Sequence, residues 1–362
     1  MKNLKKIQPA RFWVVLPVWA ALLLGSCVFA EKEADKTSEV KSIVIMTWNL
    51  NNFFDAIETG SEYDEFRESA GWSTEKYLGR VNTVASAIGK VDPAPDIIAV
   101  QEIESELALE DLAKSLSGYS WIHFANNPDA AIGLGIISRF PLNETRVHSI
   151  VINGIVTPRP VLETRIEAGG EPLVLFVCHW KSKVGGEVAT EEGRRASARV
   201  ILRRVRELAQ LEPQLPAVIM GDLNINHNEF YRRNGNAICA LLPDDPECAE
   251  LTNKLQLDFI IVSGDKPPQA NCFNGDALAF YSPWTRELKN GSYFYKNDWE
   301  TIDHFLLSEQ LFNNRGWDFD DCTVIDYQPF VNSKGYPVSY NPKTGAGLSD
   351  HLPLLLFLKM QE

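Results

Sequence analysis

The chain has 362 residues, of which 45% are hydrophobic and 23% are charged. This ordinary globular composition, without repeats or low-complexity tracts, excludes a fibrous or disordered protein and predicts a buried core. The formal net charge is −13, and it becomes −17 when the four basic residues of the predicted leader are lost. A surface that binds polyanions must therefore be a local basic patch, because the field of the whole molecule repels phosphates.

Residues 1–26 are typical of a signal peptide: a basic start is followed by an apolar stretch and a small-residue exit. The apolar stretch, 12–24, is short for a transmembrane helix. Leu-Gly-Ser-Cys resembles a bacterial lipoprotein processing box, which predicts Cys27 as the lipidated first residue, a membrane anchor, and a polar tether over 27–40. A cut after Ala30 would instead release a secreted protein. We expect an exported monomer, at the cell envelope or in the periplasm, whose single domain spans 41–362.

The remaining five cysteines are an odd number, so at least one thiol stays free in an exported chain. Cys178 lies in an apolar strand and is expected to be buried. Cys239 and Cys248 bracket a loop that a disulfide could close in an oxidising compartment, and a second pairing would join Cys272 to Cys322. The spacing does not match a structural zinc site.

The sequence pattern of the first half of the domain predicts strands and helices in alternation, followed by several strands in succession. Ser73 or Thr74 is a suitable cap for a helix that continues to about Lys90, with Leu78 on its buried face. Because no helix separates the later strands, we expect them to pair antiparallel. The predicted segments are a strand near 43–48, a helix over 74–90, a strand over 96–101, a helix over 107–116, and strands over 121–124, 134–138, 147–151 and 161–166.

The second half predicts a long helix, further strands and an aromatic segment. Six arginines of the helix either form a cationic patch or lie on a solvated face. Aromatic residues over 266–297 suit either a loop that rims a substrate site or a self-packed loop. The last strand is apolar throughout, so it should lie inside a sheet. The predicted segments are strands over 173–179, 216–221, 257–262, 301–307 and 352–358, and a helix over about 187–209.

Polar side chains stand where several of these apolar runs begin or end. The run from Pro216 stops at Asp222 and Asn224, and others end at Asn49, Glu102 and His179. Alone, a Gly-Asp-x-Asn sequence is more typical of a solvated turn. Its recurrence at successive strand ends instead indicates carboxylates, amides and imidazoles gathered at one edge of the sheets, which suits a hard cation and proton transfer.

Six motifs, in order, resemble the endonuclease/exonuclease/phosphatase superfamily, and they cover essentially the whole mature chain. The His-Trp-Lys-Ser-Lys sequence that begins at His179 also resembles predicted extracellular bacterial nucleases. This resemblance implies an α/β four-layer sandwich like that of deoxyribonuclease I, with two mixed β-sheets packed face to face between helical layers. The motifs are Trp48-Asn49-Leu50-Asn51, Gln101-Glu102, Cys178-His179-Trp180-Lys181-Ser182-Lys183, Gly221-Asp222-Leu223-Asn224, Ile302-Asp303-His304 and Ser349-Asp350-His351.

The resemblance also implies a metal site. Glu102 would be the principal ligand, and Asn49 and Asp350 would complete or support the metal shell. Oxygen ligands of this kind suit Mg²⁺, or Mn²⁺, rather than zinc.

The catalytic roles follow from the same resemblance. His351 would take a proton from the attacking water, and Asp303 would hold its other ring nitrogen. Asp222 and Asn224 would orient that water and bind phosphate oxygens. His179 would stabilise developing charge or assist protonation of the leaving group.

Four other residue assignments complete this scheme or are set apart from it. Arg159 and Lys181 are candidates for substrate binding, and Arg159 is as compatible with a structural role. His304 faces the other side of its strand and is expected to be structural. The acidic partner that some relatives supply to the first histidine is not evident, with Asp129 and Glu163 both possible.

The sequence therefore predicts a metal-dependent phosphodiesterase that acts on nucleic acid, DNA or RNA, outside the cytoplasm. A sphingomyelinase, a phospholipase C or a phosphomonoesterase of the same superfamily is the alternative, and the loop from Tyr281 to Tyr295 would then meet lipid. A catalytically silent surface binding protein is a further alternative. It is disfavoured because such a protein has no use for the complete acid–base set.

Overall fold

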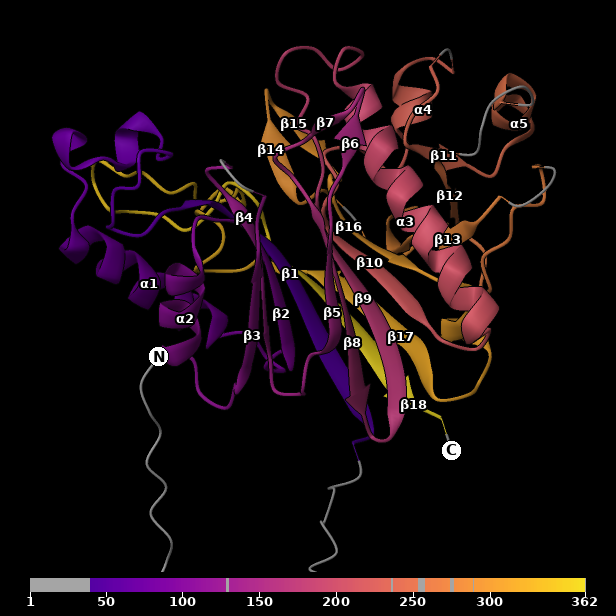
Figure 1. The fold of residues 1–362 in the computed structure, drawn as a ribbon, viewed down its shortest axis with the longest axis horizontal. Helices are drawn as coiled ribbons and strands as arrows, with labels where there is room; N and C mark the ends of the chain where they lie inside the picture. The colour runs from indigo at the N-terminus through magenta and orange to yellow at the C-terminus, as the bar shows by residue number, and fades with distance from the viewer. Residues whose placement is uncertain are drawn as a thin grey trace, which may run out of the picture. The chain divides into compact units, whose positions relative to one another are not determined.

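Two mixed β-sheets lie face to face at the centre of the computed structural model, and helices cover their outer sides (Figure 1). The structure describes residues 40–127, 130–235, 237–252, 258–273, 277–288 and 290–361. The predicted leader and tether, apart from residue 40, lie outside these ranges. Within them, no helix is both long enough and apolar enough to span a bilayer.

The first sheet has six strands, and two neighbouring strands inside it come from opposite ends of the domain. β1 pairs antiparallel with β18 on one side and parallel with β2 on the other. The last strand therefore lies inside a sheet, which confirms the expectation from its apolar sequence. In spatial order the strands are β17 (Trp317–Val324), β18 (Leu354–Met360), β1 (Ser42–Phe53), β2 (Ile97–Ile103), β4 (Gly133–Ser138) and β3 (Trp121–Ala125).

The second sheet has eight strands, with the parallel pair β9 and β10 near its middle. The successive strands of the first half do pair antiparallel, as β3 with β4 and as β8 with both β5 and β9. In spatial order the strands are β11 (Leu241–Pro243), β12 (Ile260–Ser263), β13 (Ala279–Tyr281), β16 (Asp303–Leu307), β10 (Ala217–Asp222), β9 (Glu171–His179), β8 (Val161–Ala168) and β5 (Asn143–His148).

The space between the sheets is filled by alternate residues of their facing strands, because side chains along a strand point alternately to its two faces. Ile43 and Ile45 of β1 meet Leu175 of β9 and Val218 of β10 in one fully buried cluster. The opposite faces of the same strands point outward and need helices to cover them.

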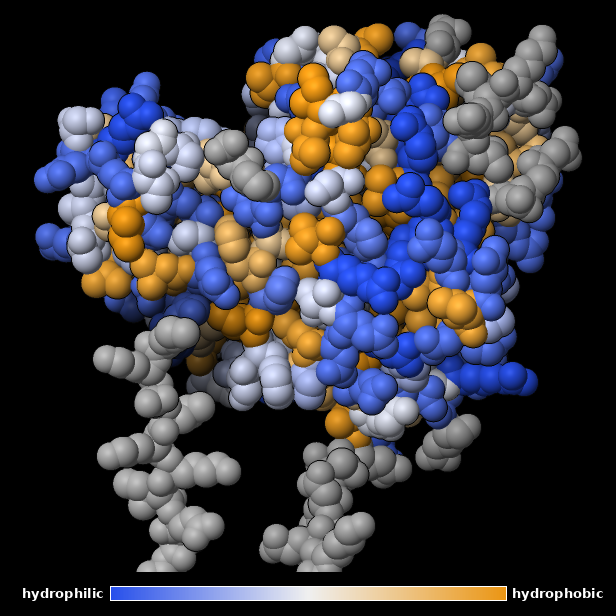
Figure 2. Space-filling view, in the orientation of Figure 1, coloured by the Kyte–Doolittle hydropathy of each residue, from blue (hydrophilic) through white to orange (hydrophobic). Residues whose placement is uncertain are grey.

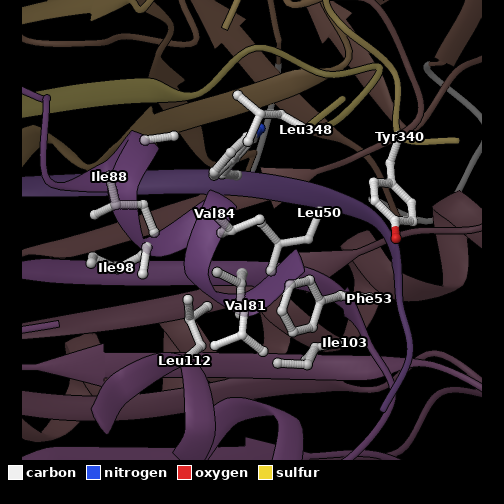
Figure 3. Packing of buried hydrophobic residues seen from close by; sticks show 14 of the residues in the cluster. Leu50, Phe53, Val81, Val84, Ile88, Ile98, Ile103, Leu112, Tyr340 and Leu348 are labelled. Atoms are coloured by element: carbon white, nitrogen blue, oxygen red, sulfur yellow. The ribbon is translucent and has the colours of Figure 1, made fainter. Parts of the chain in front are cut away.

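One outer layer is made of α1 (Thr74–Ile88) and α2 (Glu106–Lys114), which pack on the six-stranded sheet (Figure 3). Ser73 caps α1 by accepting a hydrogen bond from the backbone N–H of Lys76, as the sequence predicts. Leu78, predicted on the buried face, is 46% exposed, and Tyr77 is buried in its place. The aromatic ring of Tyr77 packs edge-on against Phe53 of β1.

The other outer layer is α3 (Glu191–Leu211), which covers the eight-stranded sheet with Ile201 and Leu202. Its arginines form neither a free cationic patch nor a uniformly solvated face. Arg195 bonds Asp258 at 2.7 Å, and Arg204 bonds Glu163 at 2.9 Å. The hydrophilic surface over α3 in Figure 2 is thus largely neutralised by ion pairs.

The predicted disulfides are wrong, since all five described cysteines are free thiols. Cys239 and Cys248 are buried in the apolar cluster beneath α3, whereas Cys322 lies in the cluster between the sheets. Cys272 acts electrostatically on Cys248 and so lies near the cluster beneath α3, on a different side of the eight-stranded sheet from its predicted partner Cys322. Burial raises the pKa of Cys239 and Cys248 to about 12, so both stay protonated and inert at neutral pH.

The remaining elements are short and lie around the ends of the strands. The hairpin of β6 and β7 carries exposed aliphatic residues, and β14 and β15 form a second small hairpin. They are β6 (Val151–Ile152), β7 (Ile155–Val156), β14 (Tyr293–Tyr295), β15 (Asp298–Glu300), α4 (Glu229–Arg232), α5 (Pro246–Thr252), η1 (Asp64–Phe66), η2 (Glu68–Ala70), η3 (Pro283–Thr285) and η4 (Glu309–Phe312).

Candidate active site

The polar residues predicted at strand ends meet at one edge of the sheet pair. Asp222 ends β10, and its Cα is in register with His179 of β9 on one side and Asp303 of β16 on the other. Residues directly opposite each other in a sheet present their side chains on the same face. Because β16 runs antiparallel to β10, its first residue reaches the edge where β10 ends.

Three side chains from both sheets form a compact donor cluster at this edge. The Nε2 atom of His179 lies 3.4 Å from Oδ2 of Asp222 and 3.6 Å from Oε1 of Glu102. The three donor atoms all lie within 4.8 Å of one another. Asn49 connects the two carboxylates, with its Nδ2 donating to Glu102 at 3.2 Å and to Asp222 at 3.1 Å.

Local backbone irregularities aim Glu102 into this cluster. Glu102 has a φ of 62°, and the pairing of β2 with β4 shifts register there, which indicates a β-bulge. Asn51 and Asn52 also have positive φ, and the backbone N–H of Asn52 donates to Glu102 Oε2 at 2.8 Å. A left-handed conformation at a non-glycine residue costs about 1–3 kcal/mol and tends to occur at functional sites.

A buried arginine holds the strand end that carries the two asparagines. Arg80 of α1 is 1% exposed and donates hydrogen bonds to the carbonyl oxygens of Leu50, Asn51 and Asn52. Its guanidinium lies 3.7 Å from the centroid of the Tyr340 ring, and burial lowers its pKa to about 9. The helical layer thereby fixes the backbone that orients Glu102.

The backbone geometry at position 221 explains why the Asp222 motif begins with glycine. Gly221 has a φ of 124°, and a Cβ atom at this position would collide with the carbonyl oxygen of Cys178 in the neighbouring strand. Only glycine allows β9 and β10 to approach this closely just before their polar ends.

His351 and Asp303 form a buried pair beside the donor cluster. Nδ1 of His351 lies 2.8 Å from Oδ2 of Asp303, and the same oxygen accepts a hydrogen bond from the Ser292 hydroxyl at 2.6 Å. Burial by itself would lower the pKa of His351, but the charge and hydrogen bond of Asp303 raise it well above its usual value. The ring of Tyr293 packs against the imidazole at 4.6 Å.

The pKa values of His179 and Asp222 are shifted mainly by burial. Burial lowers the pKa of His179 well below its usual value, and the charge of Arg159 lowers it further, so His179 is neutral. Burial raises the pKa of Asp222 to about 7, although the positive charge of His351 opposes the shift. A buried carboxylate in this state favours a nearby positive charge.

The donor cluster and His351 line one cavity of about 470 Å³. Asp350 and Asn224 line it as well, and the backbone N–H of Asn224 donates to Asp222 Oδ1 at 2.8 Å. The full lining comprises Asn51, Asn52, Glu102, Arg159, His179, Ser182, Lys183, Val184, Asp222, Asn224, Tyr293, Tyr295, Lys296, Glu300, Ile302, Asp350 and His351.

The structure places Lys181 in the wall of a neighbouring cavity, whereas Lys183 lines the catalytic one. Arg159 lines both cavities and donates to the carbonyl oxygen of Trp180. His304 points to the opposite side of β16, where its Nε2 donates to the carbonyl oxygen of Ile225 at 2.8 Å.

Glu163, one of the two acidic partners proposed for His179, is engaged elsewhere. Glu163 is held by Arg204 and by His148, whose Nε2 lies 2.6 Å from the Glu163 carboxylate. Asp129 lies outside the described residues. The acidic groups that do lie beside His179 are Asp222 and Glu102.

A sequence model of the Endonuclease/Exonuclease/phosphatase family matches residues 44–360. The chain belongs to this family. Solved structures with a similar fold include a truncated TDP2 from Caenorhabditis elegans, with 15% identity, coverage of 88% of this chain and 97% of that chain, and a TM-score of 0.53. A family protein from Bacteroides thetaiotaomicron has 17% identity, 89% and 96% coverage, and a TM-score of 0.52. The human nocturnin catalytic domain has 14% identity, 90% and 96% coverage, and a TM-score of 0.52.

A search of curated protein sequences finds no match. The family assignment and the four-layer fold expected from the sequence are both confirmed. Members of this endonuclease/exonuclease/phosphatase family are phosphoric ester hydrolases that use divalent metal ions.

The donor set of this chain fits such an ion. Glu102 and Asp222 supply carboxylate oxygens within reach of one another, Asp350 lines the same cavity, and the neutral ring of His179 lies beside the two carboxylates. Burial raises the pKa values of Asp222 and Asp350, which a cation would reverse. Asn49 turns its amide nitrogen toward the carboxylates, and its oxygen accepts from the backbone N–H of Asn51.

Several residues of the family site were not predicted individually. Ser292 and Tyr293 hold the Asp303–His351 pair, and Asn52 holds Glu102. No spacing pattern marks Ser292, because its loop is distant in sequence from His351. Of the aromatic segment, Tyr281 is buried whereas Tyr295 lines the catalytic cavity, so the two parts of that loop differ.

Proposed function

We propose that this protein is a divalent-metal-dependent phosphodiesterase that hydrolyses nucleic acid, as an endonuclease on DNA, RNA or both. One observation carries the proposal: a carboxylate–imidazole donor cluster and a buried Asp–His pair open into the same cavity. Proton transfer and charge stabilisation at one phosphate require both sets of groups within a few ångströms.

In the proposed mechanism, His351 is the general base. Its Nδ1 faces Asp303, which leaves Nε2 to accept a proton from the attacking water. Asp303 then stabilises the imidazolium by its adjacent negative charge, and Ser292 keeps that carboxylate oriented. Against the effect of burial, the surrounding carboxylates, Asp303 first, raise the pKa of His351 well above its usual value, and the positive metal ion would lower this pKa so that the neutral ring can act as a base.

Glu102, Asp222 and Asp350 would hold Mg²⁺ or Mn²⁺, with His179 and Asn49 beside them. When bound, the ion supplies positive charge that polarises the phosphate and offsets the carboxylates around the general base. His179, being neutral, would donate its ring N–H to a phosphate oxygen as charge grows there. Asn224 would donate its side-chain amide to the same phosphate.

Nucleic acid is the favoured substrate because the cavity combines cations with stacked aromatic rings. Arg159 and Lys296 line it, and the rings of Tyr293 and Tyr295 stack at 6.0 Å. Positive charge tracks a phosphodiester backbone, and aromatic faces accept bases. Activity on phospholipids is the second candidate, favoured by exposed Ile155 and neighbouring aliphatic residues of the β6–β7 hairpin.

We further propose that the protein acts outside the cytoplasm, as a monomer held to a membrane by a lipid at Cys27. The support is the basic, apolar and Leu-Gly-Ser-Cys sequence of the leader. Metabolic labelling with a radioactive fatty acid tests this: label is expected on the wild type and not on Cys27→Ala. Equal labelling of both proteins would contradict the anchor.

The function is tested by incubating the purified mature chain with supercoiled plasmid and Mg²⁺. Nicking is expected, with loss on chelation and a fall of about 10³-fold or more in His351→Ala. His123→Ala is the matched control. His123 lies on β3, an edge strand of the six-stranded sheet, and this variant should cleave normally. If the wild type cleaves phospholipid or a phosphomonoester but no nucleic acid, the substrate assignment is wrong and the site chemistry stands.

A further inference from the structure

A second cavity, of about 570 Å³, adjoins the catalytic one and shares Arg159 with it. None of the roles proposed above uses this space. Lys181 also lines it, and the charge of Arg159 acts on Lys181, so the second cavity has a second cation close to the one that both cavities share. A group esterified to a phosphate in the catalytic cavity can therefore extend past Arg159 into this second cavity.

The walls of the second cavity combine flat apolar surface with one accessible aromatic ring. Tyr63 is 39% exposed, and its ring is supported by Phe54 at 5.1 Å between centroids. Ile132, Ile152 and Pro158 supply aliphatic surface around it. The negative charge of Glu102 and the positive charge of Arg159 both act on the Tyr63 hydroxyl, so Tyr63 lies within electrostatic reach of the first cavity.

Polar groups interrupt these walls. Thr157, Ser197 and Glu192 line the same cavity. The Thr157 and Ser197 hydroxyls donate to the carbonyl oxygens of Arg159 and Gly193, and Glu192 pairs with Arg199, so what each group still offers is acceptor capacity. An acyl chain would desolvate these acceptors without donating a hydrogen bond to them, which costs free energy. A nucleobase has apolar faces and a polar edge, so it can satisfy both kinds of wall at once.

The charges of the cavity limit how much of a strand it can take. Among the described lining residues, only Arg159 and Lys181 bring positive charge to it, and the negative charge of Glu192 is offset by an ion pair with Arg199 at 3.1 Å. The two segments that supply Ile152 and Ala189 to the cavity also carry the exposed aliphatic side chains of Ile155 and Val188, which offer nothing to a further phosphate. The cavity therefore suits one nucleoside, with Lys181 near the phosphate that follows.

From this geometry we infer that the second cavity is a subsite for a single unstacked nucleobase next to the scissile phosphate, which makes single-stranded nucleic acid the substrate class. The inference rests on the proposed phosphodiesterase function. A base in a duplex must leave its stack and its pair to enter such a cavity, whereas a single strand does not bear that cost. Tyr63 is the stacking platform, and Thr157, Ser197 and Glu192 meet the edge of the base.

The test compares an oligothymidylate strand with a strand of the same length in which every residue is abasic. Both carry the same phosphates and sugars, so their ratio of kcat/KM reports only the bases. The wild type should prefer the strand with bases by at least about tenfold. It should also cleave that strand faster than the same strand paired with oligoadenylate.

Two variants locate the preference in the cavity. Ala189→Trp fills it from an exposed position, and Tyr63→Leu removes the stacking ring without adding bulk. Both should lower the base preference toward unity. Leu211→Trp, at the exposed end of α3, is the matched control and should keep it. Melting temperatures verify that each variant is folded.

Hydrolysis of methyl 4-nitrophenyl phosphate separates this inference from the proposed function. If the wild type hydrolyses this ester but cleaves both strands equally, or cleaves the duplex as fast as the single strand, the subsite is refuted and the phosphodiesterase assignment stands. Retention of the preference in both cavity variants also refutes it. If Ala189→Trp instead impairs hydrolysis of sphingomyelin vesicles, the cavity takes an acyl chain. If the wild type hydrolyses no phosphodiester, both proposals fail.

Discussion

Replacing Asp303 by asparagine tests the proposed proton transfer directly. The substitution keeps the size of the side chain but removes the charge that faces Nδ1 of His351 at 2.8 Å. The asparagine amide can present its N–H₂ group to Nδ1, in which case the ring carries its proton on Nε2. That nitrogen is then unable to accept a proton from water.

The size of the effect follows from the buried position of the pair. Asp303 is 1% exposed and His351 is 7% exposed. Two unit charges about 4 Å apart interact by about 4 kcal/mol at an effective dielectric constant near 20. Loss of that stabilisation in the transition state lowers kcat by about 10³-fold, since each 1.36 kcal/mol corresponds to about tenfold.

Single-turnover plasmid cleavage at saturating Mg²⁺ measures this fall, because it isolates the chemical step from product release. Asp320→Asn, at an exposed ion pair with Lys359, is the matched control and should retain activity. If folded Asp303→Asn keeps kcat within about tenfold of the wild type, Asp303 does not support the base and the proposed mechanism is wrong.

Three further predictions concern the scaffold and are measured by urea denaturation. Arg80→Met should lower the free energy of unfolding by about 3–5 kcal/mol, because three carbonyl oxygens lose their buried donor. A change under about 1 kcal/mol would show that water replaces the guanidinium as the donor. Gly221→Ala should lower the free energy of unfolding by at least about 2 kcal/mol more than Gly154→Ala. Both glycines have positive φ, but of the two only Gly221 would place a Cβ atom against a neighbouring carbonyl. Equal losses of stability would contradict the steric explanation. Burial lowers the pKa of His304 to about 4, so the unfolded chain binds a proton below pH about 6.5 that the folded chain refuses. Stability should therefore fall from pH about 6.5 to about 4 by on the order of 3 kcal/mol, and His304→Gln should flatten this slope; an unchanged slope would assign it to other groups.

The central strands were predictable because their signals are local. The run before Asp222 is apolar over its whole length, which is the pattern of a strand buried on both faces, and the structure has β10 there. Ser73 likewise marks the start of α1 by a cap that depends on residues within one turn. Period, capping and proline placement act between near neighbours, so they can be recognised without knowledge of the fold.

Other features depend on partners distant in sequence. Leu78 fits a helical stripe but is exposed, because Tyr77 takes the buried contact by packing on Phe53 and donating a hydrogen bond to Asp111 at 2.8 Å. Cys239 and Cys248 are close in sequence, yet both are buried thiols in an apolar cluster. Which of two lysines faces the catalytic cavity is likewise decided by the path of the loop after β9.

The sequence by itself determined the chemical inventory: which strands end in carboxylates, amides and imidazoles, and therefore that hard-cation and acid–base chemistry is available. Only the tertiary structure decided that Asp222 and His179 share one donor cluster with Glu102, that Ser292 orients the Asp303–His351 pair, and that a second cavity adjoins the first. The physical reason is that strand pattern and residue type are encoded along the chain, whereas distances between side chains depend on sheet register, bulges and the packing of two sheets.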